Sequence, residues 1–399
     1  MPTLRRYSYV AFGVACTHLV FGAIVRISGS GMGCGDHWPR CYGSFFPPLN
    51  RPDLIIEVSH RYLASILLLS LVALCVAAWR RRAEAGVGGP GGVLRGSVLA
   101  VALGVSAALL GAMTVKLGTA PFATLAHWTV AMSLVAAVVA TVIRAGGLGG
   151  AAARMRGVSG KTKRAAIAGA AMALLAVVMG GLTAKYPGAA VACPSFPLCG
   201  TNPDVQGPAV HIQLTHRVLA VLLVLHLFGL VMAQRKRRDP PVIRRAATIA
   251  LSLGVFQLLV AGAMIGMHLP PVLRSLHEAT GVSIWIATFA LAYLARSAGD
   301  EQGVREPRVA PVPVDLADVG AVRASGPARD AVSTAVADPP RDGAPEPKEP
   351  WQTRVERVVL SGAEDLLVAD NDLSRAPPGR PGSTMSHSVA VIVARGADV

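Results

Sequence analysis

Four histidines recur in a pattern suited to binding a planar metal cofactor. His60 and His216 lie in matching tripeptides, SHR and THR, and His127 and His277 each lie six residues after a proline. Imidazole is a good ligand for haem iron, and facing helices that present two imidazoles at one depth can bind an iron from both sides. We therefore expect two haem-sized sites, one formed by His60 with His127 and the other by His216 with His277.

A purely structural role is the competing interpretation, because single histidines in membranes often hydrogen-bond neighbouring helices. A duplicated set of four favours function, since polar groups inside a membrane are usually functional. His18 and His226 lack the pattern: each lies alone within an apolar segment. We expect structural roles for these two.

Two cysteine pairs lie in loops between apolar segments. Cys34 and Cys41 flank GDHWPR, and Cys193 and Cys199 flank PSFPL. Disulfides persist on the outer face of a membrane, and we expect one in each loop. A redox-active pair near a cofactor is the alternative, for which the first pair, closer along the chain to Glu57, is the better candidate. The sequence has no CxxCH motif, so covalent attachment of a c-type haem is not indicated.

One acid is placed to act beside the first pair of histidines. Glu57 lies three residues before His60, on the same face of a predicted helix. It could accept a proton or stabilise charge beside a cofactor. It could equally be an acid that begins a helix, where the helix dipole favours an anion. Glu278, next to His277, is expected to point to another face and to contact the second site only through other residues.

Three arginines lie at the same outer level as these histidines: Arg26, Arg61 and Arg217. Each could pair with a haem propionate, since guanidinium groups bind carboxylates with two hydrogen bonds. An equally weighted alternative is that these arginine side chains snorkel toward the lipid headgroups.

The elements that carry these residues are apolar segments long enough to cross a bilayer. The chain is 52% apolar and 15% charged, with a mean hydropathy of +0.50, values typical of a polytopic membrane protein. A crossing needs about 20 residues and is helical by default, because unpaired backbone is costly in lipid. The sequence offers eight such segments: 7–27, 58–79, 93–115, 122–143, 164–184, 210–232, 246–267 and 271–296.

These eight segments form two similar sets of four. Residues 111–129 and 262–280 match in apolar pattern, proline and histidine. The two sets have the same orientation, which indicates a parallel repeat. We therefore predict an all-α fold of two four-helix bundles, with an N-terminal half at 1–144 and a C-terminal half at 145–299. The four site histidines are expected within the first two turns of their helices.

The charge distribution predicts the orientation. Residues 1–300 carry 27 Lys and Arg but 8 Asp and Glu, and the basic residues sit in short runs between apolar segments. This pattern marks cytoplasmic loops rather than a nucleic-acid surface. Both termini are therefore expected in the cytoplasm and both cysteine loops on the outer face of the plasma membrane.

The C-terminal region differs in composition. Residues 300–399 hold 12 of the 28 prolines and are rich in Ala, Gly and Asp. We expect a disordered cytoplasmic extension there, with a short amphipathic helix over 351–370.

Taken together, these motifs resemble the haem A synthase family over about residues 7–297. The resemblance is carried by VRISGSGMGCGDHWPRC, EVSHR, LAHWT, CPSFPLC, LTHR and LHEATG. It implies an eight-helix protein that oxidises the C8 methyl of haem O to a formyl group through a hydroxymethyl intermediate. The product, haem A, supplies terminal oxidases.

The resemblance also implies roles for individual residues. His216 and His277 would bind the iron of a resident haem b, and His60 and His127 would hold the substrate haem O. Glu57 would be the essential acid. Both cysteine pairs would be disulfides of the outer loops. Two histidines on the substrate iron leave no open position for oxygen activation there. The oxidation would then need either electron removal through the second haem or loss of one histidine ligand.

The expected partners are the lipid bilayer, a membrane electron acceptor and haem O synthase, which would hand over its hydrophobic product. A homo-oligomer is left open. One alternative is a di-haem b-type electron-transfer subunit, which would use the same histidines but would not need Glu57 or the cysteine loops. A haem carrier or transporter is a third interpretation, but such proteins usually place charged groups at mid-membrane.

Overall fold

The computed structural model describes residues 1–155, 157–200, 202–205 and 207–300, and three short segments at 355–358, 366–369 and 390–393. Within these residues eight helices are long and apolar enough to cross a membrane, as predicted. They are α1 (Pro2–Ile27), α2 (Pro52–Arg80), α3 (Val93–Lys116), α4 (Pro121–Arg144), α6 (Gly160–Lys185), α7 (Pro208–Arg237), α8 (Pro241–Gly266) and α9 (Pro271–Ser297). The chain is thus a mostly helical, multi-pass membrane protein.

Local sequence explains where these helices begin. Six of the eight have a proline in the first turn, where its missing N–H costs nothing and its fixed φ suits a helix. α6 begins instead with Ser159, whose hydroxyl accepts a hydrogen bond from the Thr162 N–H at 3.2 Å. Short elements complete the connections: the 3-10 turns Ser30–Met32 and Ala189–Val191, helix α5 (Gly150–Arg154), and strands β1 (Gly157–Val158) and β2 (Gly299–Asp300), which pair in parallel.

Helix α2 begins six residues earlier than the apolar segment predicted. Its first residue is Pro52, so Glu57 lies in the second turn and His60 is the ninth residue of the helix. His216 is likewise the ninth residue of α7. The expectation that all four histidines lie in the first two turns is therefore wrong for these two. Hydropathy marks only the lipid-facing part of a helix, whereas the proline sets its true start.

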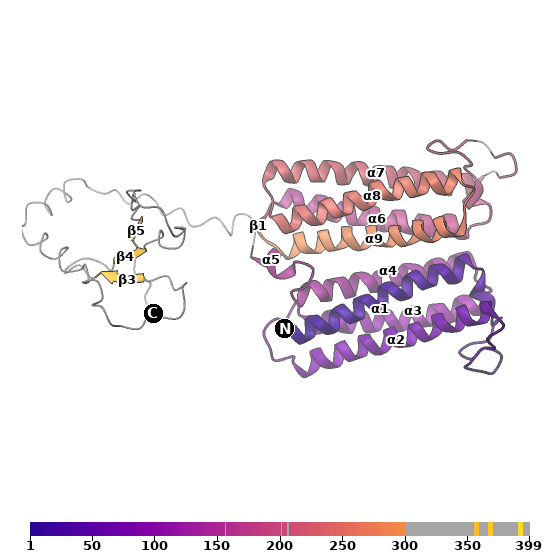
Figure 1. The fold of residues 1–399 in the computed structure, drawn as a ribbon, viewed down its shortest axis with the longest axis horizontal. Coiled ribbons are helices and arrows are strands. Elements are labelled where there is room, and N and C mark those ends of the chain that lie inside the picture. The colour runs from indigo at the N-terminus through magenta and orange to yellow at the C-terminus, as the bar shows by residue number, and fades with distance from the viewer. Residues whose placement is uncertain are drawn as a thin grey trace, which may run out of the picture. The chain divides into compact units, whose positions relative to one another are not determined.

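The long helices form two four-helix groups that run side by side (Figure 1). α1–α4 make up one group and α6–α9 the other, and the groups meet where α1 and α4 contact α6 and α9. In the most apolar window of α4, 67% of residues are buried, and in that of α9 50%, against 17–33% for the other six helices. α4 and α9 are therefore the central helices.

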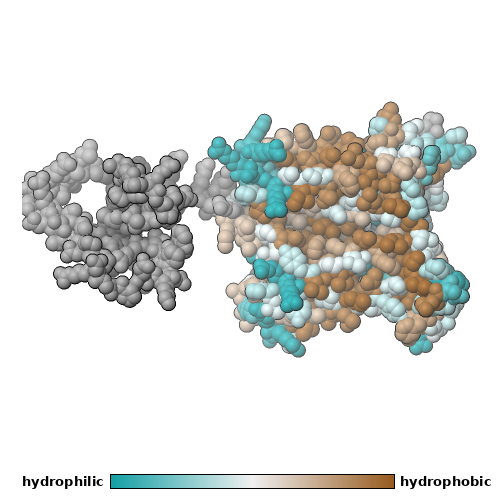
Figure 2. Space-filling model, viewed as in Figure 1, coloured by the Kyte–Doolittle hydropathy of each residue, from teal (hydrophilic) through white to brown (hydrophobic). Residues whose placement is uncertain are grey.

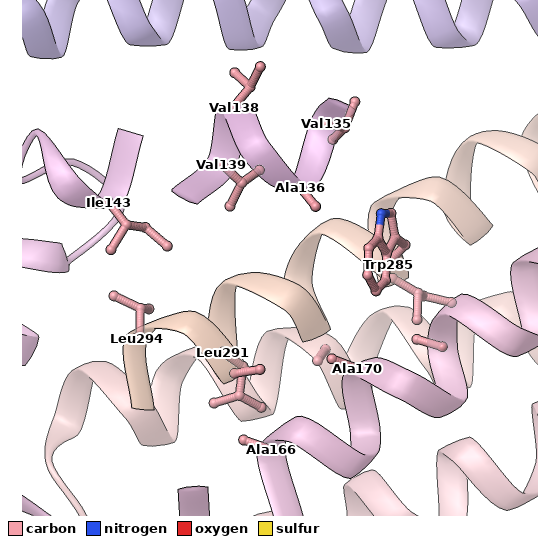
Figure 3. Close-up of a cluster of buried hydrophobic side chains, with 14 of the residues drawn as sticks. Val135, Ala136, Val138, Val139, Ile143, Ala166, Ala170, Trp285, Leu291 and Leu294 are labelled. Carbon is pink, nitrogen blue, oxygen red and sulfur yellow. The ribbon is translucent and has the colours of Figure 1, made fainter. Parts of the chain in front are cut away.

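A large apolar cluster fills the contact between the groups. Figure 3 shows Val139 and Ile143 of α4 facing Leu291 and Leu294 of α9. A buried hydrogen bond crosses the same contact, from the indole Nε1 of Trp285 to the carbonyl of Met132 at 3.0 Å. Burial of this apolar surface stabilises the two groups as one body.

The outer surface of the eight helices is apolar. Figure 2 shows a brown belt across the middle of the molecule with hydrophilic residues gathered at both ends. Leu69, Leu109 and Leu259 are 70%, 63% and 67% exposed on this belt. Such a continuous exposed apolar surface suits contact with lipid rather than water.

Residues Met1–Pro307 form one compact unit and Arg308–Val399 a second. In the second unit, strands β3 (Val355–Val358), β4 (Leu366–Ala369) and β5 (Ala390–Val393) form an antiparallel sheet in the order β3-β4-β5. The helix expected over 351–370 is wrong there, because β3 and β4 both fall within that range. The remaining part of the predicted disordered extension lies outside the described residues.

Candidate haem sites

A cavity of about 610 Å³ lies in the first helical group. It opens among α1–α4, and its wall includes Gly181, Ala184 and Lys185 of α6 and Glu278 of α9. Its polar lining consists chiefly of the candidate site residues, namely Arg26, Glu57, His60, Arg61 and His127, together with His18. The volume is within the range of pockets that enclose cofactor-sized ligands.

The cavity brings together the two histidines predicted for the first site. His127 is held in place: its Nδ1 donates a hydrogen bond to the carbonyl of Ala107 at 2.8 Å. That bond leaves Nε2 as the nitrogen with a free lone pair, the arrangement found for histidines that ligate metals. His60 is held differently, because its buried Nδ1 has no hydrogen-bond partner among the described residues.

His18 stacks directly on His60. Their ring centroids are 4.2 Å apart and the planes differ by 6°. The expectation that His18 has only a structural role rested on its being alone in an apolar segment. One sequence feature does link His18 to the site. It lies four residues before Gly22, at the place that Ala176 occupies before Gly180 in the repeat.

The second predicted pair also meets. His216 and His277 have ring centroids 6.3 Å apart and planes inclined by 77°. A metal–imidazole bond of about 2 Å puts a ring centroid roughly 3 Å from the metal, so two opposed imidazoles on one metal have centroids about 6 Å apart. The spacing therefore fits one iron between the rings. His216 Nδ1 donates to the carbonyl of Ala176 at 2.9 Å, and His277 Nδ1 lies 3.1 Å from Gln257 Nε2.

Glycines on the neighbouring helices make room for these rings. A Cβ on Gly180 would lie 2.9 Å from Cε1 of His216, and a Cβ on Gly22 would lie 3.2 Å from Cε1 of His60. Any larger residue at Gly180 would push the ring aside. The two glycines occupy matching places on α6 and α1, so the repeat extends to the helix that backs each histidine.

The acid and its counterpart in the repeat anchor the cysteine loops. Glu57 is 4% exposed, and its Oε2 accepts a hydrogen bond from the backbone N–H of Cys34 at 2.9 Å. Gln213, also three residues before its histidine, accepts through Oε1 from the N–H of Cys193 at 2.6 Å. A neutral amide can therefore do the anchoring. The negative charge of Glu57 is an addition peculiar to the first half.

Two of the predicted arginines bind the same loops. Arg61 pairs with Oε1 of Glu57 and donates to the carbonyls of His37 and Pro39, each at 2.9 Å. Arg217 donates to the carbonyls of Cys193 and Ser195 at 2.7 and 2.6 Å. Both guanidinium groups are thus largely used in holding the loops. A contact with haem propionates stays a prediction for them.

The third arginine links the two halves. Arg26 of α1 forms an ion pair with Glu278 of α9, whose side chain is 8% exposed. Glu278 does point away from the second pair of histidines, but it lines the first cavity through this ion pair. The ion pair thus connects α1, in the wall of the first cavity, with Glu278 of α9, the residue that follows His277.

Both cysteine pairs form disulfides, as predicted: Cys34–Cys41 and Cys193–Cys199. Cys34 and Cys41 are buried against Leu54 and Val58 of α2. The first disulfide loop is therefore packed directly over the turn that carries Glu57.

The fold and these residues define a multi-pass membrane protein with a pair of histidines in each helical group, the first pair lining a cavity and the second pair lying 6.3 Å apart. A family model described as "Cytochrome oxidase assembly protein", COX15-CtaA, matches residues 5–289. The chain belongs to this family. The resemblance noted from the motifs is thereby confirmed.

Curated relatives agree with the family match. The chain is 30% identical over 250 residues to a protein named heme A synthase from Geobacillus thermodenitrificans, covering 62% of this chain and 77% of the relative. The namesake of Geobacillus kaustophilus is 30% identical over 251 residues with the same coverage. That of Bacillus cereus strain 03BB102 is 27% identical over 263 residues, covering 65% of this chain and 83% of the relative.

Proposed function

We propose that this chain is a haem A synthase, an oxidoreductase that converts the C8 methyl of haem O to a formyl group through a hydroxymethyl intermediate. Family membership supports the reaction class. The observation that carries the proposal is the cavity whose lining includes Glu57, His60 and His127. A buried acid beside a haem-sized space is what an oxidation at the edge of a haem requires, and a simple electron carrier does not need it.

The first half, 1–144, would hold the substrate. His60 and His127 would bind the iron of haem O, and the apolar lining from α2, α3 and α4 would take up the hydrophobic macrocycle. Arg26 and Arg61, together with Lys185, which also lines the cavity, would complement the negative propionates.

Glu57 would act as the proton acceptor for the oxidation. Its carboxylate lies in the cavity wall, largely shielded from water, and is positioned by the Cys34 N–H and Arg61. General acid–base groups contribute about 10²- to 10⁴-fold to a rate when they are within reach of the proton they move. The disulfide loop above Glu57 would keep bulk water from the reacting methyl.

The second half, 145–299, would hold a resident haem b between His216 and His277. The 6.3 Å spacing of these rings supports this assignment. A haem bound there would supply one-electron exchange between the substrate site and an electron acceptor in the membrane. Gly180 would leave the space that the His216 ring needs.

The setting follows from the charge distribution. We place the protein in the plasma membrane with both termini in the cytoplasm and both disulfide loops on the outer face. Haem O synthase and a membrane electron acceptor would be its partners, since haem intermediates this apolar are best passed directly within the bilayer. The proposal leaves open whether the protein acts as a single chain or as a homo-oligomer.

A di-haem b-type electron-transfer subunit is the second candidate, because the His216–His277 spacing suits any bis-imidazole haem. Haem extraction distinguishes the two. The full-length protein would be expressed in membranes that make haem O but no haem A, and extracted haems identified by chromatography. Haem A or its hydroxymethyl precursor, found only with the intact protein, supports the synthase. Unchanged haem O alongside haem b, with a working electron acceptor present, supports the electron-transfer subunit.

A further inference from the structure

A second cavity, of about 270 Å³, lies at the turn between α7 and α8. It is at the opposite end of α7 from His216 and has no part in the haem sites. Its lining is Val231, Gln234, Arg235, Pro241, Arg244, Arg245 and Thr248. In Figure 2 hydrophilic residues gather at the end of the bundle where α7 ends.

The positive charge around this cavity has no acidic partner among the described residues. No acid lines it, and Arg235, Arg244 and Arg245 form no ion pair within the part of the chain that the structure describes. Asp239, the acid of this turn, is 6% exposed and accepts a hydrogen bond from Thr162 Oγ1 at 2.7 Å. It is therefore engaged with α6 rather than with the cavity.

A buried carboxamide faces the same cavity. Gln234 is 1% exposed, and neither its Nε2 nor its Oε1 has a hydrogen-bond partner among the described residues. Leaving a buried polar group unpaired costs about 1–3 kcal/mol. A ligand with oxygen acceptors would satisfy Nε2 while the arginines neutralise its charge.

The first half offers an internal comparison at its own turn between α2 and α3. There Arg81 donates two hydrogen bonds to Glu84, at 2.6 and 2.7 Å. The guanidinium lowers the pKa of the Glu84 carboxyl. The acid of the α2–α3 turn is thus bonded to an arginine of that turn, whereas the acid of the α7–α8 turn is bonded to Thr162 and not to the arginines that line the cavity.

We propose that the α7–α8 cavity binds a phosphate oxyanion, supplied by the headgroup of an anionic phospholipid. Arg244 and Arg245 would contact the phosphate oxygens and Gln234 Nε2 would donate to one of them. A basic pocket at the membrane-facing end of two transmembrane helices is where such headgroups are recognised. Free inorganic phosphate shares the chemistry and is the other possible source.

The test measures lipid retained by the full-length protein after extraction from bilayers containing phosphatidylglycerol and phosphatidylcholine, using native mass spectrometry. R244Q/R245Q and Q234L should each lower retained phosphatidylglycerol about tenfold. The matched control, R80Q/R82Q at the α2–α3 turn, removes the same charge and should retain it.

Three outcomes are decisive. Equal loss in the control would reduce the effect to general charge and overturn the site, as would no loss in either site variant. Protection of the protein against heat by millimolar phosphate without lipid, abolished in R244Q/R245Q, would support the oxyanion site and assign it to the free ion.

An independent observation carries a second inference, about His18. His127 and His216 are each fixed through Nδ1 by a backbone carbonyl, of Ala107 and Ala176. His60 has no such bond, and His18 stacks on it instead. His18 precedes Gly22 by four residues, as Ala176 precedes Gly180, so a ring stands where the repeat has a small side chain.

We infer that His18 is a positioning residue for His60, and that His60 is the less restrained of the two substrate-site histidines. This inference rests on the proposed function, because it concerns the ligand of haem O. A stack constrains the plane of a ring but leaves it free to slide, whereas a hydrogen bond fixes its rotation. His60 is therefore the ligand suited to leave the iron when an open position is needed.

The test uses full-length protein carrying haem O and resident haem b, and follows carbon monoxide binding to the ferrous protein. H18A should raise the fraction of haem O that binds carbon monoxide several-fold, and H18F, which keeps a flat ring, should restore the wild-type fraction. An H18A spectrum like the wild type, or H18F behaving like H18A, overturns the inference. An unchanged haem O spectrum in H60A would instead overturn the proposed substrate site.

Discussion

Glu57 and Gln213 make the same hydrogen bond in the two halves of the protein. Each accepts from the backbone N–H of the first cysteine in a disulfide loop, at 2.9 and 2.6 Å. The anchor works with a neutral amide in one half, so the carboxylate in the other half serves a further purpose. This pair separates the structural role of Glu57 from its chemical role.

Glu57→Gln should therefore keep the fold, the Cys34–Cys41 disulfide and bound haem, but lose product. A loss of about 10²-fold or more in haem A formation is expected for removal of a general base. Extracted haems would be quantified by chromatography. Gln213→Glu is the matched control and should leave product formation near normal. Normal product from the Glu57 variant would remove the role assigned to it.

Replacing either histidine of the second pair should remove resident haem b. His216→Ala or His277→Ala leaves one imidazole where the 6.3 Å spacing supplies two. The reduced absorption spectrum of the purified protein would measure the loss. His226→Ala is the control, because His226 Nε2 bonds to the carbonyl of Ala165 at 2.8 Å and takes no part in the pair. An unchanged spectrum in His216→Ala and His277→Ala would contradict the assignment of these two histidines as the ligands of haem b.

Gly180→Ala should disturb the same haem without removing a ligand. Its new Cβ would lie 2.9 Å from Cε1 of His216, closer than real Cβ contacts, so the ring must shift. We expect a changed low-spin absorption spectrum and weaker haem retention. Gly229→Ala, on α7 with nothing within 4 Å of its Cβ, should be neutral or slightly stabilising. Identical spectra in both variants would contradict the packing role of Gly180.

Breaking the ion pair between the halves should destabilise the protein. Arg26→Met leaves Glu278, 8% exposed, as a buried charge without its partner, at a cost of about 3 kcal/mol. The double variant R26M/E278M should recover much of that loss. Unfolding in detergent, followed by circular dichroism, gives the double-mutant cycle. Additive effects of the two single changes would show that the pair is not coupled.

Deleting 301–399 should leave membrane insertion and haem A formation largely intact. Both proposed haem sites lie within the unit Met1–Pro307. Membrane fractionation and haem extraction from cells expressing the truncated chain would measure the effect. A truncated protein that inserts but makes no haem A would give the C-terminal region a part in function.

The sequence predicted the eight helices because apolar length is a strong signal in a membrane protein. It placed their ends less well, since α2 continues outward to Pro52 beyond its apolar segment. It also paired His216 with His277, whose rings lie 6.3 Å apart, and His60 with His127, which line one cavity, because the repeat supplied two copies of one pattern. The strands at 355–369 were missed, since short Val- and Leu-rich runs among polar residues do not distinguish strand from helix.

Other features of the site depend on contacts between distant segments, which spacing alone does not reveal. The stack of His18 on His60 joins α1 to α2, and the pair of Arg26 with Glu278 joins α1 to α9. Neither contact joins residues at helical spacing. Only the packing of the helices brings them together.

The wall that α6 and α9 contribute to the first cavity makes the first copy of the repeat dependent on the second. Gly181, Ala184, Lys185 and Glu278 belong to one copy, yet they close a chamber that the other copy carries. A gene fragment encoding the first repeat alone would yield a chamber open to lipid on one side. Duplication here has produced a chamber that one copy of the repeat cannot complete without the other.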